Sequence, residues 1–387
     1  MKKILLLFSA LLFIGIITFM ALKIYLPKAN FQRSASTDAL IKTALGKKDC
    51  ASVTANSAYT PTYQGPLIDT HIHIPSIPDG PMGGDFRVTE QPIMGVNVQM
   101  ADYICLMENE KIEKVFAFFP AWEPIINEQL TLADGALKTF PNRFVPFIMP
   151  PDRDDRPDGY PTVDAQKLSE MLQEYPDLFV GYGEIGLYER GDHGGPKGAP
   201  ALPPDSKRMM EIYELVREHS LIVYVNLGQG QKESFENALS AFPEVHFIWH
   251  GDQLITGSGI NQDLQEIDDI LNSHSNVYYG VDELYGDVWL LRQDSSKEKF
   301  LAHFDNPEPL LEQDVATWKA FIERHPDQVI WGTDRGGGGV LWSLDPEVGI
   351  TLTSYARAFI ARLDPAVQEK FAYKNAERLL VAGEKRP

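Results

Sequence analysis

Cysteine is scarce in this chain, with only Cys50 and Cys105 among 387 residues. No Cys-x-x-Cys pair occurs, which excludes both a thiolate zinc site and a disulfide scaffold. Cys105 lies in an apolar, helix-forming stretch, Tyr103–Met107, so we expect it in a hydrophobic core. The spacing of the two cysteines gives no support to a bridge, and we predict that they are not bonded to each other.

Positive charge is also scarce, because 35 Lys and Arg face 54 Asp and Glu, for a net charge of −19. The first 30 residues hold four lysines and no acid, which leaves −23 on the remainder. Such a surface repels phosphate backbones, so nucleic-acid binding and nuclease activity are disfavoured. The glycine run Gly336–Gly339 has no Lys or Ser at P-loop positions, so it does not predict a phosphate cradle.

The N-terminal segment begins with two lysines and an uncharged run, Ile4–Leu22. Its 19 residues exceed the roughly 7–15 of a cleavable signal core and approach the roughly 20 that span a bilayer. No convincing cleavage site and no lipobox-like cysteine follows it. We predict a signal anchor or signal peptide in residues 1–25, a polar stalk or linker in 26–64, and a membrane-anchored or exported, extracytoplasmic catalytic domain in 65–387.

From residue 65 onward, short β-forming runs alternate with helical ones, which is typical of a parallel sheet with crossover helices. The expected strands are Leu67–His71, Val115–Phe119, Phe144–Met149, Phe179–Glu184, Leu221–Asn226, Val245–His250, Val277–Val281 and Val329–Thr333. The expected helices between them are Val98–Lys111, Ile126–Lys138, Asp164–Glu174, Asp205–His219, Lys232–Ala241, Asn261–Asn272 and Val315–Arg324. Eight strands that are apolar on both faces predict a closed α/β structure, a (β/α)8 TIM barrel.

Polar residues stand at the ends of four expected strands. His71 and His73 are two apart at the end of the first strand and should therefore point to the same face. Glu184, His250 and Asp334 end the fourth, sixth and eighth strands, each after an apolar run where burying a charge is costly unless it is paired or bound to a metal. Two imidazoles with carboxylates suit a divalent cation, so we predict a metal site at this end of the barrel.

These motifs resemble the amidohydrolase superfamily, and most closely its amidohydrolase-2 branch. The resemblance extends from Leu67 to Leu380 and includes the closing segment Tyr373–Leu380. It implies a (β/α)8 barrel with one or two divalent ions, zinc being the first expectation and manganese or another transition metal the alternative.

The resemblance also implies roles for single residues. His71, His73 and Asp334 would bind the first metal, and Asp334 would accept a proton from the attacking water. His250 would bind a second ion or polarise the substrate carbonyl. The segment Gly183–Leu187 resembles TatD-type hydrolases, in which its glutamate, here Glu184, is a metal ligand.

One position departs from the family pattern, because Asn226 stands where a histidine usually ends the fifth strand. Three interpretations stay open: Glu184 replaces the missing ligand, the site is mononuclear, or the metal affinity is degraded. We favour a mononuclear site with Glu184 assisting and Asn226 facing the substrate. Arg335, next to Asp334, is a further candidate for binding a substrate carboxylate.

The sequence therefore predicts a metal-dependent hydrolase that acts on the amide or lactone bond of a small organic molecule. The alternatives are a metal-dependent decarboxylase of an unsaturated or aromatic acid and a non-catalytic barrel with a degenerate metal site. The expected partners are the small-molecule substrate and, through the N-terminal segment, the membrane. The sequence leaves the oligomeric state open, a homo-oligomer included.

Overall fold

The computed structural model describes residues 35–54, 59–77, 94, 98–121, 125–151, 159–188, 200–228, 230–251, 264–282, 284, 296–336 and 341–384. The chain divides into two compact units, Met1–Ala39 and Leu40–Pro387, and the second contains the whole barrel. The predicted anchor, Ile4–Leu22, lies outside the described residues. Within the described ranges, no helix is both long and apolar enough to cross a membrane.

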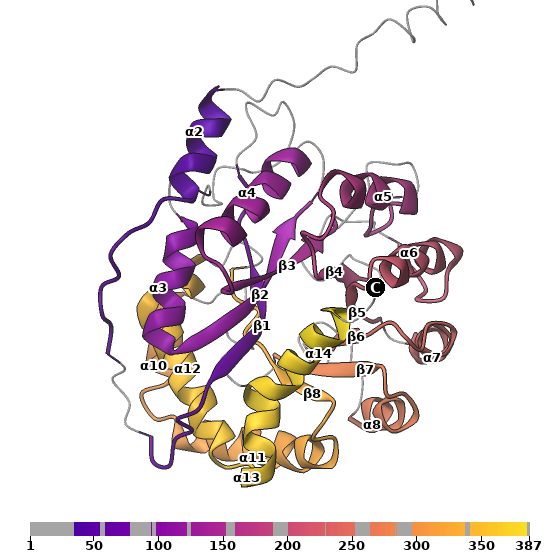
Figure 1. Ribbon diagram of the computed structural model, residues 1–387. Coiled ribbons are helices and arrows are strands. Elements are labelled where there is room, and N and C mark those ends of the chain that lie inside the picture. The colour runs from indigo at the N-terminus through magenta and orange to yellow at the C-terminus, as the bar shows by residue number, and fades with distance from the viewer. Residues whose placement is uncertain are drawn as a thin grey trace, which may run out of the picture. The chain divides into compact units, whose positions relative to one another are not determined.

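Eight parallel strands form one sheet in the order of the chain, with helices around them (Figure 1). The strands are β1 Leu67–His73, β2 Ile112–Pro120, β3 Phe144–Met149, β4 Gly181–Gly186, β5 Ile222–Asn226, β6 Phe247–His250, β7 Val277–Val281 and β8 Val329–Trp331. The chain just after β8 returns to β1, where Ile72 pairs in parallel with Arg335 and His73 N donates to Arg335 O at 2.8 Å. These contacts nearly close the sheet, and the predicted (β/α)8 barrel is confirmed.

Six of the seven helices expected between the strands lie within three residues of their predicted bounds, whereas the helix expected at Val315–Arg324 begins at Glu308. With several others outside these seven, the helices are α2 Ala35–Ala44, α3 Met100–Glu110, α4 Ile126–Thr139, α5 Ala165–Glu174, α6 Lys207–Glu218, α7 Lys232–Ala241, α8 Leu264–Ser273, α10 Lys297–His303, α11 Glu308–Arg324, η2 Leu341–Leu344, α12 Pro346–Ile360, α13 Pro365–Glu369, η3 Lys370–Lys374 and α14 Asn375–Glu384. Polar caps fix several starts, because Asp164 and Ser206 accept from the backbone N–H groups three residues on, at Lys167 and Met209.

The strands are apolar on both faces because each face meets its own core. Side chains on the outer face pack with the helices in one large cluster. A second cluster fills the barrel interior, with Phe116, Phe118, Phe147, Tyr224 and Tyr278 as its aromatic members. This interior packing forms the barrel floor beneath the carboxyl ends of the strands, the end at which barrel sites are built.

Part of the segment expected as a linker belongs to the barrel unit. Ile41, Ala44 and Tyr63, which lie within this segment, are buried in the outer core. A disulfide joins Cys50 to Cys105 of α3, with 5.1 Å between their Cα atoms. The prediction that these cysteines are not bonded is wrong, because chain packing brings together residues whose spacing gave no sign of it.

Candidate metal centre

The two histidines of β1 face the same way, as their spacing predicted. His71 Nε2 lies 3.2 Å from His73 Nε2, and His71 is fully buried while His73 is slightly exposed. Their backbone is held on both sides, because His71 N donates to Asp69 Oδ1 at 3.1 Å and His73 O accepts from Tyr103 OH at 2.9 Å. Both rings pack on Phe118 of the barrel floor.

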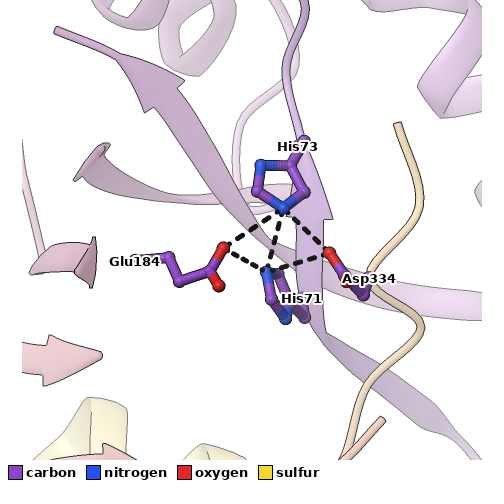
Figure 2. Close-up of side chains that lie close together, drawn as sticks. All are labelled: His71, His73, Glu184 and Asp334. Atoms are coloured by element: carbon purple, nitrogen blue, oxygen red, sulfur yellow. Dashed lines mark hydrogen bonds and ion pairs between the residues drawn. The ribbon is translucent and has the colours of Figure 1, made fainter. Parts of the chain in front are cut away.

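Two carboxylates approach this imidazole pair from opposite sides, Glu184 from β4 and Asp334 from the chain after β8 (Figure 2). Glu184 Oε2 lies 3.4 Å from Nε2 of each histidine. Asp334 Oδ1 lies 3.3 Å from His71 Nε2 and 2.8 Å from His73 Nε2. Asp334 has a φ of 48°, in the left-handed region that a non-glycine residue adopts only rarely. The structure thus brings together four of the predicted ligands.

The four facing atoms have the spacing that a tetrahedral ion requires. Bonds of roughly 2.0–2.1 Å to a tetrahedral zinc keep neighbouring ligand atoms about 3.3 Å apart. Five of the separations among the four atoms run from 2.8 to 3.4 Å, and all four atoms lie within 4.8 Å of one another. The residues therefore fit a divalent ion with two nitrogen and two oxygen ligands.

The charges of this cluster also suit a cation. Burial alone would lower the pKa of His71, but Asp334, Asp282 and Glu184 raise it well above its ordinary value. Burial would raise the pKa of Glu184 and of Asp334, yet the neighbouring histidines hold both below their ordinary values. The two carboxylates are thus charged at neutral pH and attract positive charge, which a proton or a divalent ion supplies.

His250, the last residue of β6, lies beside the four ligands and not among them. Its Nε2 is 3.6 Å from Glu184 Oε1 and 3.8 Å from Asp334 Oδ2. Its ring meets that of His71 edge-on, with centroids 4.5 Å apart, and it is fully buried. His250 does not supply one of the four facing atoms, but it forms a second group with His71 and Asp282, whose ligand atoms also lie within 4.8 Å of one another.

Asn226 ends β5 and is 1% exposed. Its amide nitrogen donates to Glu184 Oε1, the oxygen that faces away from the two histidines of β1. Glu184 thus keeps Oε2 towards the imidazoles and Oε1 towards Asn226 and His250. Asn226 thus hydrogen-bonds Glu184, a proposed metal ligand, and orients its carboxylate.

Arg335, which we expected to bind a substrate carboxylate, lies inside the protein and is paired with another residue. The side chain is fully buried, and its Nη1 and Nη2 donate to Glu110 Oε1 and Oε2 at 2.9 and 2.8 Å. Its Nε donates to Thr333 Oγ1, which in turn donates to Asp69 Oδ2. Burial raises the pKa of Asp69 to about 7, although Arg335 and Thr333 act against it. Arg335 therefore joins the end of β8 to β1 and α3, away from solvent.

The sequence analysis did not identify Asp282 and Glu110 as residues close to the site. Asp282 directly follows the apolar run of β7, as His250 and Asp334 follow theirs, so the same rule would have identified it. Its Oδ2 lies 3.2 Å from His71 Nδ1. Glu110 ends an amphipathic helix, and no sequence signal distinguishes it from a solvated residue.

The sequence profile of the amidohydrolase-2 family, described as amidohydrolase, matches residues 68–381. The chain belongs to this amidohydrolase family. The match begins at the second residue of β1 and extends beyond β8. It therefore includes all eight strands and all the proposed ligands. No curated protein matches the chain.

Solved structures similar to this amidohydrolase are distant in sequence. An uncharacterised TIM-barrel protein from Bordetella bronchiseptica is 16% identical, with a TM-score of 0.50 over 83% of this chain and all of its own. A probable 2-pyrone-4,6-dicarboxylic acid hydrolase from Acinetobacter baumannii is 12% identical, with a TM-score of 0.48 over 81% of this chain and 99% of its own. A zinc-bound amidohydrolase from Burkholderia multivorans is 13% identical, with a TM-score of 0.44 over 82% and 99%. The first of these supports the barrel fold.

Proposed function

We propose that this amidohydrolase is a metal-dependent hydrolase that cleaves the amide or lactone bond of a small organic molecule. The observation that carries the proposal is the convergence of His71, His73, Glu184 and Asp334 at tetrahedral spacing. These four residues would hold a divalent ion, which would lower the pKa of a water molecule from 15.7 to about 7 and so would supply a nucleophile at neutral pH. Zinc suits two imidazoles and two carboxylates, and manganese is the alternative.

The two oxygens of Asp334 face different groups. Oδ1 lies against the two histidines of β1, whereas Oδ2 faces His250 Nε2 at 3.8 Å. Asp334 is charged at neutral pH, because the histidines hold its pKa low. Oδ2 can therefore take the proton of the attacking water and return it to the leaving group.

In this proposal His250 would contact the substrate carbonyl, because its Nε2 faces the two carboxylates of the cluster. This nitrogen faces Glu184 Oε1 at 3.6 Å and Asp334 Oδ2 at 3.8 Å, and so points towards the carboxylates of the proposed metal centre. An N–H at this position stabilises the negative charge that develops on the attacked oxygen, as an oxyanion hole does.

Turnover of a panel of lactones, amides and carboxylic acids in water enriched in ¹⁸O tests the reaction class. Hydrolysis places solvent oxygen in the product acid, which mass spectrometry detects. Release of carbon dioxide without ¹⁸O incorporation would instead identify a decarboxylase. Binding of panel members without any turnover by the zinc-loaded protein would favour the non-catalytic barrel.

The role of His250 is tested by His250→Asn, with His246→Asn as the matched control. His246 precedes the same strand, and its ring contacts Tyr278, a member of the interior cluster. We expect His250→Asn to lower kcat about 100-fold while zinc content stays unchanged, and His246→Asn to keep kcat. Equal kcat in the two variants would contradict the role given to His250.

A further inference from the structure

We propose that Asp282 is a positioning residue that holds His71 and His250 by their Nδ1 atoms, so that both rings present Nε2 to the metal centre. The inference rests on the proposed metal-dependent function and extends it to a residue outside the ligand set. Asp282 directly follows β7 and is 1% exposed. A carboxylate buried to this degree is costly unless donors surround it.

One oxygen of Asp282, Oδ2, faces Tyr224, His71 and His250. Oδ2 accepts a hydrogen bond from Tyr224 OH at 3.1 Å and lies 3.2 Å from His71 Nδ1. His250 Nδ1 is 3.7 Å from the same oxygen. Tyr224 of β5 and His71 of β1 are therefore within hydrogen-bonding distance of this oxygen, whereas His250 of β6 faces it at ion-pair distance, beyond the length of a hydrogen bond.

The consequence for the histidines follows from the two nitrogens of imidazole. For His71, an Nδ1 proton donated to the carboxylate keeps the lone pair of Nε2 for a metal. For His250, whose Nε2 serves as a donor in the proposed function, Asp282 acts on the position of the ring. His71 Nε2 is the atom that faces His73, Glu184 and Asp334 at 3.2–3.4 Å. His250 Nε2 likewise faces Glu184 and Asp334. A single carboxylate therefore sets the orientation of one ligand and of the substrate-facing histidine.

Two glycines, Gly280 of β7 and Gly332 just after β8, leave space for this carboxylate. A Cβ atom at position 332 would overlap Asp282 Oδ1, and one at position 280 would lie 3.4 Å from Asp282 Oδ2 and 3.1 Å from Tyr224 Oη. Any larger residue at 332 would displace Asp282 from His71. The space around Asp282 is thus shaped for the carboxylate and its donors.

A direct ligand role is the competing reading, since atoms of His71, His250 and Asp282 also lie within 4.8 Å of one another. Positioning accounts better for Tyr224, whose hydroxyl donates to the same oxygen that a second ion would need. It also accounts for His71, whose Nε2 already belongs to the four-atom cluster.

The test compares Asp282→Asn with Asp314→Asn in the full chain. Asp314 is the matched control, because it is also a buried carboxylate that accepts from a tyrosine, Tyr355, but on the outer helices. Zinc affinity is measured by competition with a chromophoric chelator, and the ligand field by the visible spectrum of the Co²⁺-substituted protein. We expect Asp282→Asn to weaken zinc binding 10- to 100-fold and to change the spectrum, and Asp314→Asn to leave both unchanged.

The melting temperature of the metal-free variants separates positioning from loss of fold, and Asp282→Asn should melt as a cooperative folded protein. Equal zinc affinity and identical Co²⁺ spectra in wild type and Asp282→Asn would overturn the inference while leaving the metal centre intact. A second equivalent of zinc that Asp282→Asn loses would also overturn it, by making Asp282 a ligand. Wild-type protein that binds no zinc at all would overturn the proposed function itself.

Discussion

Asn226 occupies the strand end where the family resemblance leads one to expect a histidine. In the structure its amide nitrogen donates to Glu184 Oε1, and Glu184 Oε2 is the oxygen that faces the histidines of β1. The amide therefore fixes which oxygen is offered to the ion. This arrangement supports a mononuclear site in which Glu184 is the carboxylate ligand from β4 and Asn226 is its partner.

We predict that Asn226→His weakens zinc binding by about 10-fold or more, because the variant removes the donor that orients Glu184. Zinc titration against a chelator measures the change. The control is His219→Asn, because His219 is exposed at the end of α6 and lies outside the metal cluster. Tighter zinc binding by Asn226→His would instead indicate a metal site that has decayed at this position.

The ion pair of Arg335 and Glu110 is a second feature at the residue scale, and it affects the stability of the barrel. Both side chains are fully buried, and Thr353 also donates to Glu110 Oε2 at 2.7 Å. Removing one partner of a buried pair leaves an uncompensated charge, whereas replacing both by apolar residues is often nearly neutral.

Glu110→Gln should therefore lower the free energy of unfolding by roughly 3–5 kcal/mol, as measured by urea denaturation of the metal-free protein. Glu108→Gln, an exposed position on the same helix, is the control and should change little. The double variant Glu110→Leu/Arg335→Met should be more stable than either of its single variants. A stability of Glu110→Gln equal to that of wild type would contradict this account of the pair.

At the scale of elements, α3 connects the N-terminal part of the barrel unit to the site. Tyr103 of this helix donates to the backbone of His73, Glu110 at its end holds Arg335, and Cys105 bonds to Cys50. Asn109 adds hydrogen bonds to the backbone of Ala51 and Val53. The residues from Cys50 to Val53 are thus attached to α3 both covalently and through hydrogen bonds.

The disulfide closes a loop with a sequence separation of 55 residues. Chain entropy gives such a bridge about 4 kcal/mol at most, and native proteins commonly realise about 2–4 kcal/mol. We predict that Cys50→Ser lowers the free energy of unfolding by this amount, which is seen as a lower urea midpoint. The zinc content of the variant should stay unchanged. Reduced wild type should show the same midpoint as the variant, and a variant as stable as the oxidised protein would refute the prediction.

The elements were predictable because each depends on local pattern. Runs such as Phe144–Met149 and Val277–Val281 are apolar on both faces, and the structure has strands with the same bounds. The pairing of Arg335 with Glu110, which are 225 residues apart, was not predictable, because it depends on how α3 packs beside the end of β8. The same holds for the disulfide, since only tertiary packing brings Cys50 to Cys105.

At the scale of the whole molecule, two features support the proposal that the barrel is exported. Disulfides persist in oxidising compartments and are rare in the cytosol, and the chain carries one between Cys50 and Cys105. The run Ile4–Leu22 is apolar enough for a signal or an anchor. Both would be expected of a protein whose catalytic domain lies outside the cytoplasm.

We predict that the full chain, expressed in bacterial cells, acquires the disulfide, whereas a chain lacking residues 1–25 keeps both thiols reduced. Labelling with a maleimide of high mass after acid quenching distinguishes the two by electrophoresis. Free thiols in the full chain would contradict export, and Cys50→Ser/Cys105→Ser provides the unlabelled reference.

The site as a whole was partly predictable for a physical reason. Parallel strands of a barrel bring their carboxyl ends to one rim, so His71, His73, Glu184, His250 and Asp334 meet although the sequence separates them widely. What each residue does there depends on which atom faces which neighbour. The orientation of Glu184 by Asn226 and the burial of Arg335 therefore required the structure.

The central claim is that the four facing atoms bind a divalent ion. It is tested most directly by the metal content of the full chain, purified without chelator, beside His71→Ala/His73→Ala and the control His219→Ala/His274→Ala, whose histidines lie outside the cluster. The account predicts about one equivalent of a divalent transition metal per chain in wild type and control, and almost none in the first variant. No bound metal in wild type, even after exposure to zinc or manganese, would contradict it.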